Sequence, residues 1–179
     1  MSSGTVESSA AGQARPPGGV AKPVFHTLPY EHPDVAGLVE QIQQEYVRIY
    51  GGRDDTPMTP GEFAAPDGAF VVGYLDDEPV AMGGWRFRPD VVAPEGARPA
   101  EIKRMFVVAE RRRTGLARAV IAELERTAAE AGADALILET GKPQIGAEEF
   151  YRSCGYADTV RFGYYADKPH TVYLGKALA

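Results

Sequence analysis

Cysteine and histidine are scarce in this chain. A single cysteine, Cys154, excludes an internal disulfide and any metal site built from several cysteines, and it favours a reducing cytoplasm as the protein's location. The three histidines, His26, His32 and His170, are scattered and lack the spacing of metal ligands. The sequence therefore predicts no metal cofactor.

Long apolar runs and an excess of positive charge are also missing. No apolar segment approaches the roughly 18 residues that a membrane-spanning helix needs, and the first residues lack the hydrophobic centre of a signal peptide. The formal net charge of −6 argues against a general nucleic-acid binder and mildly favours a cationic partner. We expect a soluble cytoplasmic protein with neither membrane nor nucleic acid as partner.

The length of 179 residues suits one domain with a tail. Residues 1–22 are rich in Ser, Gly, Ala and Pro and contain almost no large apolar side chain, so they cannot repay the entropy cost of ordering. The sequence predicts a disordered tail over residues 1–22 and a single domain over residues 23–179.

Hydrophobic periodicity predicts an alternation of strands and helices along that domain. Segment 53–66 contains three prolines and is expected to be a loop, with a short helix start at Thr59. This order of elements indicates an α/β domain with a mixed sheet and helices packed against it. Strands are expected over residues 24–28, 69–75, 79–87, 101–108, 135–138, 159–165 and 171–174, and helices over about 34–50, 114–131 and 147–153.

The most informative stretch is residues 112–117, Arg-Arg-Thr-Gly-Leu-Ala, between a predicted strand and a predicted helix. The first backbone N–H groups of a helix have no partner within the helix, and the helix dipole adds partial positive charge there. Gly115 allows the backbone to approach a ligand closely. The segment therefore predicts a site for a phosphate group, although a surface arginine run before an ordinary helix is the simpler alternative.

The pattern Arg112-x-x-Gly115-x-Ala117 resembles the acyl-coenzyme A signature of the GNAT acyltransferase superfamily. The preceding residues 101–107 resemble that family's fourth strand, at the expected separation. Residues 138–151 and the pair at 155–156 resemble its fifth strand, the following helix and the start of the sixth strand. The close match covers residues 101–156, and the order of elements fits from about Val24 onward.

The resemblance implies a mostly antiparallel central sheet with flanking helices, splayed between the fourth and fifth strands. It also implies acetyl-CoA as the acyl donor, with its pantetheine arm along the fourth strand and its pyrophosphate at residues 112–117. Unpaired N–H and C=O groups on a splayed strand can satisfy an amide arm as another strand would. The implied coenzyme A contacts are Phe106, Val107, Val108, Arg112, Arg113, Thr114, Gly115, Leu116, Ala117, Arg118, Gln144 and Tyr151.

Acyl transfer to an amine needs a base for the ammonium proton and a proton for the leaving thiolate. By resemblance, Glu101 lies where several relatives keep a general-base glutamate, and Tyr151 matches a tyrosine that serves as general acid. Glu139 is a second candidate base, and water is a third. The simpler alternatives are a solvated charge for Glu101, a core aromatic for Tyr151 and a structural role for Glu139.

The acceptor site is expected in the variable segments 46–66 and 88–99 and at the end of the hairpin predicted over residues 69–87. Tyr46, Arg86 and Glu139 are candidate acceptor contacts, and so is Trp85, for which burial in the core is the simpler account. Carboxylates in the variable loop, such as Asp54, would suit a cationic amine.

The resulting prediction is an N-acetyltransferase that moves an acetyl group from acetyl-CoA to a primary amine by direct attack in a ternary complex. A small-molecule amine is preferred, because nothing in the chain marks an extended peptide groove; a protein lysine or N-terminus is the alternative. A non-catalytic acyl-CoA-binding regulatory module is the alternative of another class. Exposed sheet edges at the C-terminal hairpin would also permit a homodimer.

Overall fold

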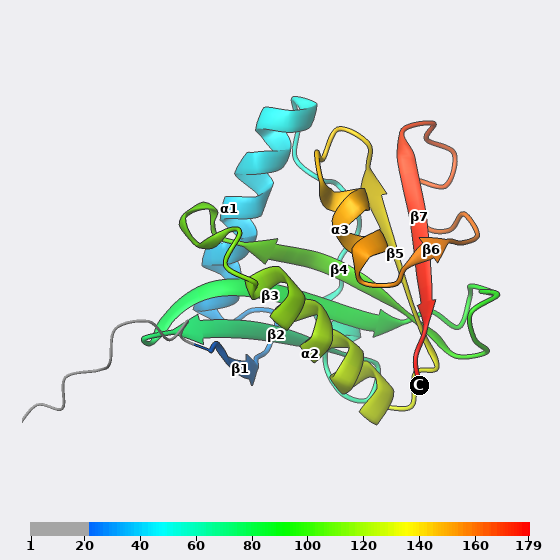
Figure 1. Ribbon diagram of the computed structural model, residues 1–179, viewed down its shortest axis with the longest axis horizontal. Coiled ribbons are helices and arrows are strands. Elements are labelled where there is room, and N and C mark those ends of the chain that lie inside the picture. Colours follow the sequence, from blue (N-terminus) through cyan, green and yellow to red (C-terminus); the bar gives the residue numbers. More distant parts are fainter. Residues whose placement is uncertain (1–21) are drawn as a thin grey trace, which may run out of the picture.

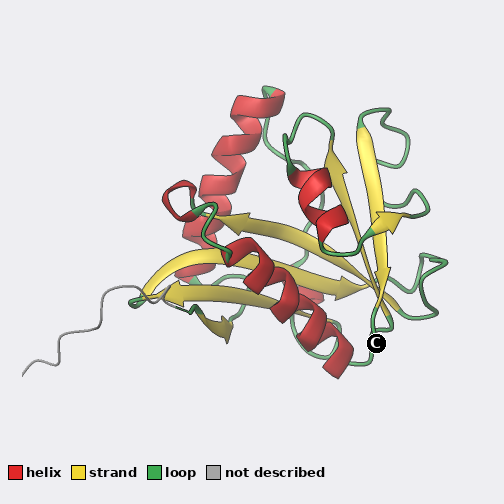
Figure 2. Ribbon diagram, in the orientation of Figure 1, coloured by secondary structure: helices red, strands yellow, loops and turns green. Residues whose placement is uncertain are grey.

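A seven-stranded sheet with helices on both faces forms the domain (Figures 1 and 2). The computed structural model describes residues 22–179, so nearly all of the predicted tail lies outside the described residues. The spatial strand order is β1-β2-β3-β4-β5-β7-β6. The elements are β1 (Val24–Thr27), α1 (Pro33–Tyr50), η1 (Pro60–Phe63), β2 (Gly68–Leu75), β3 (Glu78–Phe87), β4 (Pro99–Val107), η2 (Ala109–Arg111), α2 (Leu116–Glu130), β5 (Ala135–Gly141), α3 (Ala147–Ser153), β6 (Ala157–Asp158) and β7 (Thr171–Ala177).

Helix α1 covers one face of the sheet. Its apolar residues Val35, Leu38 and Ile42 recur at intervals of three and four, and they are buried against strand residues such as Phe70. The helix starts with a proline and ends at Gly51, which adopts a left-handed conformation with φ of 77°. These local signals set the bounds of α1, and the end of the helix lies near β4 and β5, with which Tyr46 and Tyr50 line one cavity.

Helix α2 packs on the opposite face. Val120, Ile121 and Leu124 are buried there among side chains of β2, β3, β4 and β5. Trp85 belongs to the same core, and its indole N–H donates to the Thr127 hydroxyl at 2.9 Å. One face of β4 therefore packs toward α1, and the opposite face packs toward α2.

Strands β4 and β5 are parallel neighbours only at their starts. Pairing is confined to residues 99–101 of β4 and residues 135–137 of β5. Beyond this point β5 and β7 run away from β4, as Figure 1 shows, and the edge of β4 from Ile102 onward has no strand partner among the described residues. The expected mixed, mostly antiparallel sheet, splayed between the fourth and fifth strands, is confirmed.

A β-bulge lies in the middle of β4. The register with β3 shifts between Met82 and Gly84, where β4 carries one extra residue. Arg104 at this point has a positive φ of 55°, which is uncommon for a residue with a side chain. The bulge turns Lys103 and the next residue, Arg104, toward the same side of the sheet, where both line one cavity.

The predicted strand over residues 159–165 is wrong. Only Ala157 and Asp158 pair with β7, and the chain then leaves the sheet edge. Phe162 is buried against the ring of Tyr173 at a centroid distance of 5.4 Å, and the hydroxyl of Tyr165 donates to Asp54 at 2.7 Å. These tertiary contacts outweigh the strand pattern and make the segment a loop that reaches the α1 side of the sheet.

None of the helices in residues 22–179 has the length and apolar character needed to cross a membrane.

Replacing Gly84 by alanine is expected to destabilise the fold by about 1–3 kcal/mol. A Cβ atom at this position would lie 2.4 Å from a ring carbon of Phe70 and 2.9 Å from one of Phe63. Urea unfolding would measure the loss. The control is Gly37→Ala on α1, where a Cβ meets nothing within 4 Å and should stabilise the helix slightly; equal stability of the two variants would contradict this account of the packing.

Candidate active site

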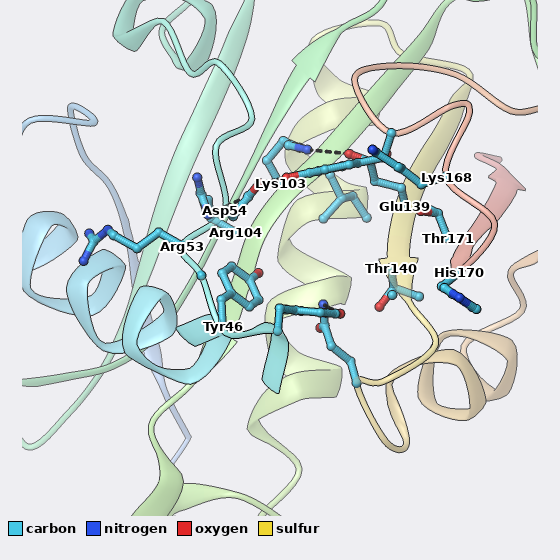
Figure 3. A pocket seen from close by; sticks show the side chains of 16 residues that line it. Tyr46, Arg53, Asp54, Lys103, Arg104, Glu139, Thr140, Lys168, His170 and Thr171 are labelled. Carbon is cyan, nitrogen blue, oxygen red and sulfur yellow. Dashed lines mark hydrogen bonds and ion pairs between the residues drawn. The ribbon is translucent and has the colours of Figure 1, made fainter. Parts of the chain in front are cut away.

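A cavity of about 320 Å³ opens where β4 and β5 separate, on the α1 side of the sheet (Figure 3). Its walls come from the end of α1, the loop after it, the bulged part of β4, the end of β5 and the loop before β7. A second cavity of about 300 Å³ adjoins it, and Glu139 lines both. Residues far apart in the sequence thus meet at the splayed point of the sheet.

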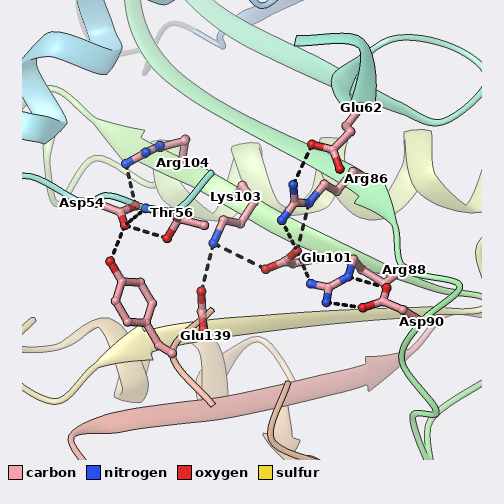
Figure 4. Close-up of polar contacts among 11 residues, drawn as sticks. Asp54, Thr56, Glu62, Arg86, Arg88, Asp90, Glu101, Lys103, Arg104 and Glu139 are labelled. Carbon is pink, nitrogen blue, oxygen red and sulfur yellow. Dashed lines mark hydrogen bonds and ion pairs between the residues drawn. The ribbon is translucent and has the colours of Figure 1, made fainter. Parts of the chain in front are cut away.

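Glu101, the predicted base, is surrounded by cations (Figure 4). Its Oε2 accepts hydrogen bonds from Arg86 at 3.0 Å and Arg88 at 2.6 Å, and its Oε1 lies 3.4 Å from the ammonium of Lys103. Its side chain is only 1% exposed. Burial alone would raise the pKa of Glu101, but these three cations outweigh burial and hold the pKa below its ordinary value. A carboxylate held in this way is a weak proton acceptor.

Glu139 has the opposite character. Its Oε1 accepts a hydrogen bond from Lys103 at 2.9 Å, while its Oε2 is buried without a hydrogen-bond partner among the described residues. Burial raises the pKa of Glu139 above its ordinary value, and the attraction of Lys103 offsets only part of that effect. A carboxylate with a raised pKa and a free oxygen at a cavity wall fits a proton-accepting role.

Arg104 contributes a buried guanidinium to the cavity. Its side chain is 4% exposed, and its Nη1 lies 2.8 Å from Oδ2 of Asp54. The other oxygen of Asp54 accepts hydrogen bonds from the backbone and hydroxyl of Thr56 and from the hydroxyl of Tyr165. Asp54 therefore anchors the loop after α1 to both Arg104 and the loop before β7.

Tyr151 lies on the α2 side of the gap between β4 and β5, whereas the cavity lies on the α1 side. Tyr151 belongs to α3, packs against the α2-side core, and does not line either cavity. Its hydroxyl donates to the sulfur of Met105 at 3.4 Å, a weak acceptor. Burial raises the pKa of Tyr151. At the gap between β4 and β5, Glu139 therefore lies toward the α1 face of the sheet and Tyr151 toward the α2 face.

The predicted phosphate loop offers a row of free backbone donors. Within the described chain, the N–H groups of residues 113–118 donate to no backbone or side-chain acceptor. Arg113 and Gly115 have φ of 64° and 89°, so the backbone turns sharply just before α2. Successive free N–H groups at a helix start form a concave site for an anion such as a diphosphate.

Three other residues that were predicted to contact coenzyme A form hydrogen bonds or ion pairs within the chain: Arg112, Arg118 and Val108. The Nε of Arg112 donates to the carbonyl of Val107 at 3.1 Å, and its guanidinium forms an ion pair with Glu45 of α1. Arg118 donates to the hydroxyl of Ser153 at 2.9 Å. The N–H of Val108 donates to β3 at 3.0 Å, so this group faces away from the open edge of β4.

The predicted acceptor residues separate into two groups. Tyr46 and Glu139 line the first cavity, and Arg86 lines the second with Glu139. Trp85 lines neither cavity. It is 2% exposed in the α2-side core, in agreement with the simpler alternative of a buried core residue. Gln144 lines the first cavity, and its amide donates to the hydroxyl of Tyr50 at 3.0 Å.

Sequence reasoning did not single out Lys103, Arg104, Arg88 or Tyr165. A signal was present for the first two, because charged residues inside a strand flanked by apolar runs suggest buried polar contacts. No such signal marked Tyr165, since it lies in the segment that was predicted as a strand. Among the described residues, no group of three or more His, Cys, Asp or Glu side chains is arranged to hold a metal ion.

Comparison with known proteins identifies a family with this architecture. The model of the acetyltransferase (GNAT) family matches residues 39–156. A protein named IAA acetyltransferase from Azospirillum brasilense is 30% identical over 144 residues, which are 80% of this chain and 90% of that protein.

Solved structures share the fold. A GNAT-family acetyltransferase from Staphylococcus aureus superposes with a TM-score of 0.66 at 19% identity, covering 87% of this chain and 100% of that chain. A GNAT-family acetyltransferase from Elizabethkingia anophelis with acetyl-CoA bound gives a TM-score of 0.59 at 14% identity, covering 88% and 99%.

Proposed function

Because the chain belongs to the GNAT family of acetyltransferases, and is thus an acyl-CoA-dependent enzyme, we propose that it acetylates the primary amine of a small molecule by direct attack in a ternary complex. The observation that carries the proposal is the position of Glu139. Its free, buried oxygen borders the cavity on one side of the strand opening, and the Tyr151 hydroxyl lies on the other side.

Two features of the chain fit the donor. The free N–H groups of residues 113–118 suit the diphosphate of coenzyme A, and the unpaired edge of β4 suits the amides of its pantetheine arm. Both features lie on one path from the start of α2 to the bulge of β4. A thioester delivered along this path would come to lie between Glu139 and Tyr151.

Glu139 is proposed as the general base in place of Glu101. The ammonium form of the acceptor loses one proton to the Glu139 carboxylate, and the freed nitrogen lone pair forms a bond to the acyl carbon. The carbon–sulfur bond breaks, and its electron pair leaves with the thiolate of coenzyme A. The nitrogen, now bonded to the acyl carbon, releases its second proton to solvent and becomes the neutral amide. The raised pKa of Glu139 favours this proton transfer, whereas the lowered pKa of Glu101 opposes it.

Tyr151 is proposed to donate a hydrogen bond to the departing thiolate. Its present acceptor, the sulfur of Met105, is a weak one, so the hydroxyl is available to a negatively charged sulfur. A thiol has an ordinary pKa of about 8.5, well below that of a buried phenol, so the thiolate needs stabilisation more than complete protonation. Solvent can supply the proton after departure.

The proposal is tested by incubating the purified full chain with acetyl-CoA and a broad panel of amines while free thiol is measured. Release of coenzyme A with at least one small amine, together with an acetylated product of the expected mass, is the predicted result. Release only with peptides would favour a protein lysine or N-terminus as acceptor. Tight acetyl-CoA binding without release for any amine would favour the non-catalytic regulatory module.

Replacing Tyr151 by phenylalanine is expected to lower kcat by about tenfold, at the low end of acid–base contributions, because a thiolate leaves readily. The affinity for coenzyme A should change little. Steady-state kinetics with the best amine would measure both quantities. The control is Tyr30→Phe on a half-buried tyrosine that lines neither cavity, and equal kcat values for the two variants would remove Tyr151 from the mechanism.

A further inference from the structure

Unsatisfied polar atoms gather at one place in the molecule. Among the described residues, four buried side-chain nitrogen or oxygen atoms have no hydrogen-bond partner: Nε and Nη1 of Arg104, Oε2 of Glu139 and Oγ1 of Thr140. All three residues line the first cavity (Figure 3). Buried polar groups without partners are rare in folded proteins, so a cluster of them at a cavity indicates a ligand that supplies the missing partners.

The unsatisfied atoms are of two kinds. The guanidinium nitrogens of Arg104 are donors and carry positive charge, so they bind an anionic acceptor more strongly than a neutral one. The Oε2 of Glu139 is an acceptor when ionised and requires a donor, as an ammonium group supplies. The hydroxyl of Thr140 can act either way.

The ion pair with Asp54 does not supply the hydrogen-bond acceptors that the Arg104 guanidinium lacks. Asp54 lies 2.8 Å from Nη1 as an ion pair, but the contact lacks hydrogen-bond geometry, and Nε has no hydrogen-bond acceptor within residues 22–179. Its other oxygen is occupied by Thr56 and Tyr165. The guanidinium therefore retains the capacity to bind a carboxylate.

Basic side chains outnumber acidic ones in the lining of the cavity, within an acidic protein. Four Lys or Arg side chains and two carboxylates line it, although the whole chain carries a formal net charge of −6. Lys168 stands exposed at the rim, and its ammonium has no ion-pair partner among the described residues. The remaining wall is aromatic, formed by Tyr46, Tyr50 and Tyr165, and so suits an apolar substituent.

We infer that the acceptor is an amino carboxylate, with its amine at Glu139 and its carboxylate at Arg104. The inference rests on the proposed function and narrows its substrate class to zwitterions such as amino acids. An amine that lacks a carboxylate would leave the Arg104 nitrogens without acceptors and would be acetylated poorly.

The first test uses the unaltered full chain and matched acceptors. L-phenylalanine is compared with 2-phenylethylamine, L-tryptophan with tryptamine, and 4-aminobutanoate with propylamine, with coenzyme A release as the readout. At least one amino carboxylate is expected to exceed its matched amine about 10- to 100-fold in kcat/KM, the range of one charged hydrogen-bonded contact. Equal or higher kcat/KM for the plain amine in every pair would overturn the inference.

The second test places the effect on Arg104. Arg104→Gln should raise the KM for the preferred amino carboxylate at least tenfold more than it raises the KM for the matched amine, and Arg104→Lys should restore part of this difference. Because both acceptors are assayed on one protein, a general folding defect would lower both. Equal losses would overturn the inference. Arg126→Gln, on the exposed face of α2, is the control.

Thermal unfolding with each acceptor separates this inference from the proposed function. An amino carboxylate that raises the unfolding temperature of the full chain, without coenzyme A release, would retain the inference and overturn the proposed function. Release of coenzyme A only with amines that lack a carboxylate would retain the proposed function and overturn the inference. No thermal shift and no release with any amino carboxylate would overturn the inference.

Discussion

Replacing Glu139 by glutamine is expected to lower kcat by about 100-fold or more, the range that general-base catalysis contributes. The amide keeps the size of the carboxylate and can still accept a hydrogen bond from Lys103, but it cannot take the ammonium proton. Folding should be retained, because Lys103 keeps its second carboxylate, Glu101, at 3.4 Å. Single-turnover kinetics with saturating acetyl-CoA would measure the effect on the chemical step.

The pH profile distinguishes a base from a residue that only positions others. In the unaltered protein, activity should fall as the pH drops through the raised pKa of Glu139, because the protonated carboxyl cannot accept a proton. This acid limb should vanish in Glu139→Gln. The control is Glu148→Gln on α3, an exposed glutamate. A Glu139→Gln variant with nearly unchanged kcat and pH profile would leave water or Glu101 as the base.

Replacing Glu101 by glutamine is expected to reduce the free energy of unfolding by about 3–5 kcal/mol, the usual cost of removing one partner from a buried ion pair. Three cations would lose the carboxylate that they share at a site that is 1% exposed. The second partners that they keep, Glu62, Asp90 and Glu139, are each more exposed than Glu101. Urea unfolding would measure the loss. Glu62→Gln is the matched control, because Glu62 pairs with Arg86 at the rim with 44% exposure and should cost less than about 1 kcal/mol.

The pH dependence of stability gives a second measure of Glu101. Its pKa in the folded protein is lower than in the unfolded chain, where a glutamate titrates at about 4.3. The stabilisation is therefore complete above that value and is lost as the pH falls toward the folded pKa. The stability difference between the unaltered protein and Glu101→Gln should shrink in acid, and a constant difference from pH 7 to pH 3 would contradict this account.

Local patterns were sufficient for most of the elements and for the proposal of the donor site. Helix α3 was predicted with its observed bounds, because its residues carry helical periodicity and Gly155 ends the turn. The phosphate loop at residues 112–117 was predicted for the same reason, since a glycine before a helix start depends on neighbouring residues alone. Segment 159–165 failed because buried contacts of Phe162 and Tyr165 with distant residues outweigh its strand pattern.

The sequence by itself indicated the fold family and an acyl-CoA donor through the resemblance of residues 101–156, because the helix starts and the glycine-containing turn that carry it are properties of short segments. Only the tertiary structure shows how the surroundings of the two glutamates differ. Arg86 and Arg88 reach Glu101 from β3 and the segment after it, and thereby lower its pKa, whereas Glu139 keeps a free oxygen and a raised pKa at the cavity. Charge and burial around a carboxylate depend on residues far apart in the chain, so no local pattern contains them.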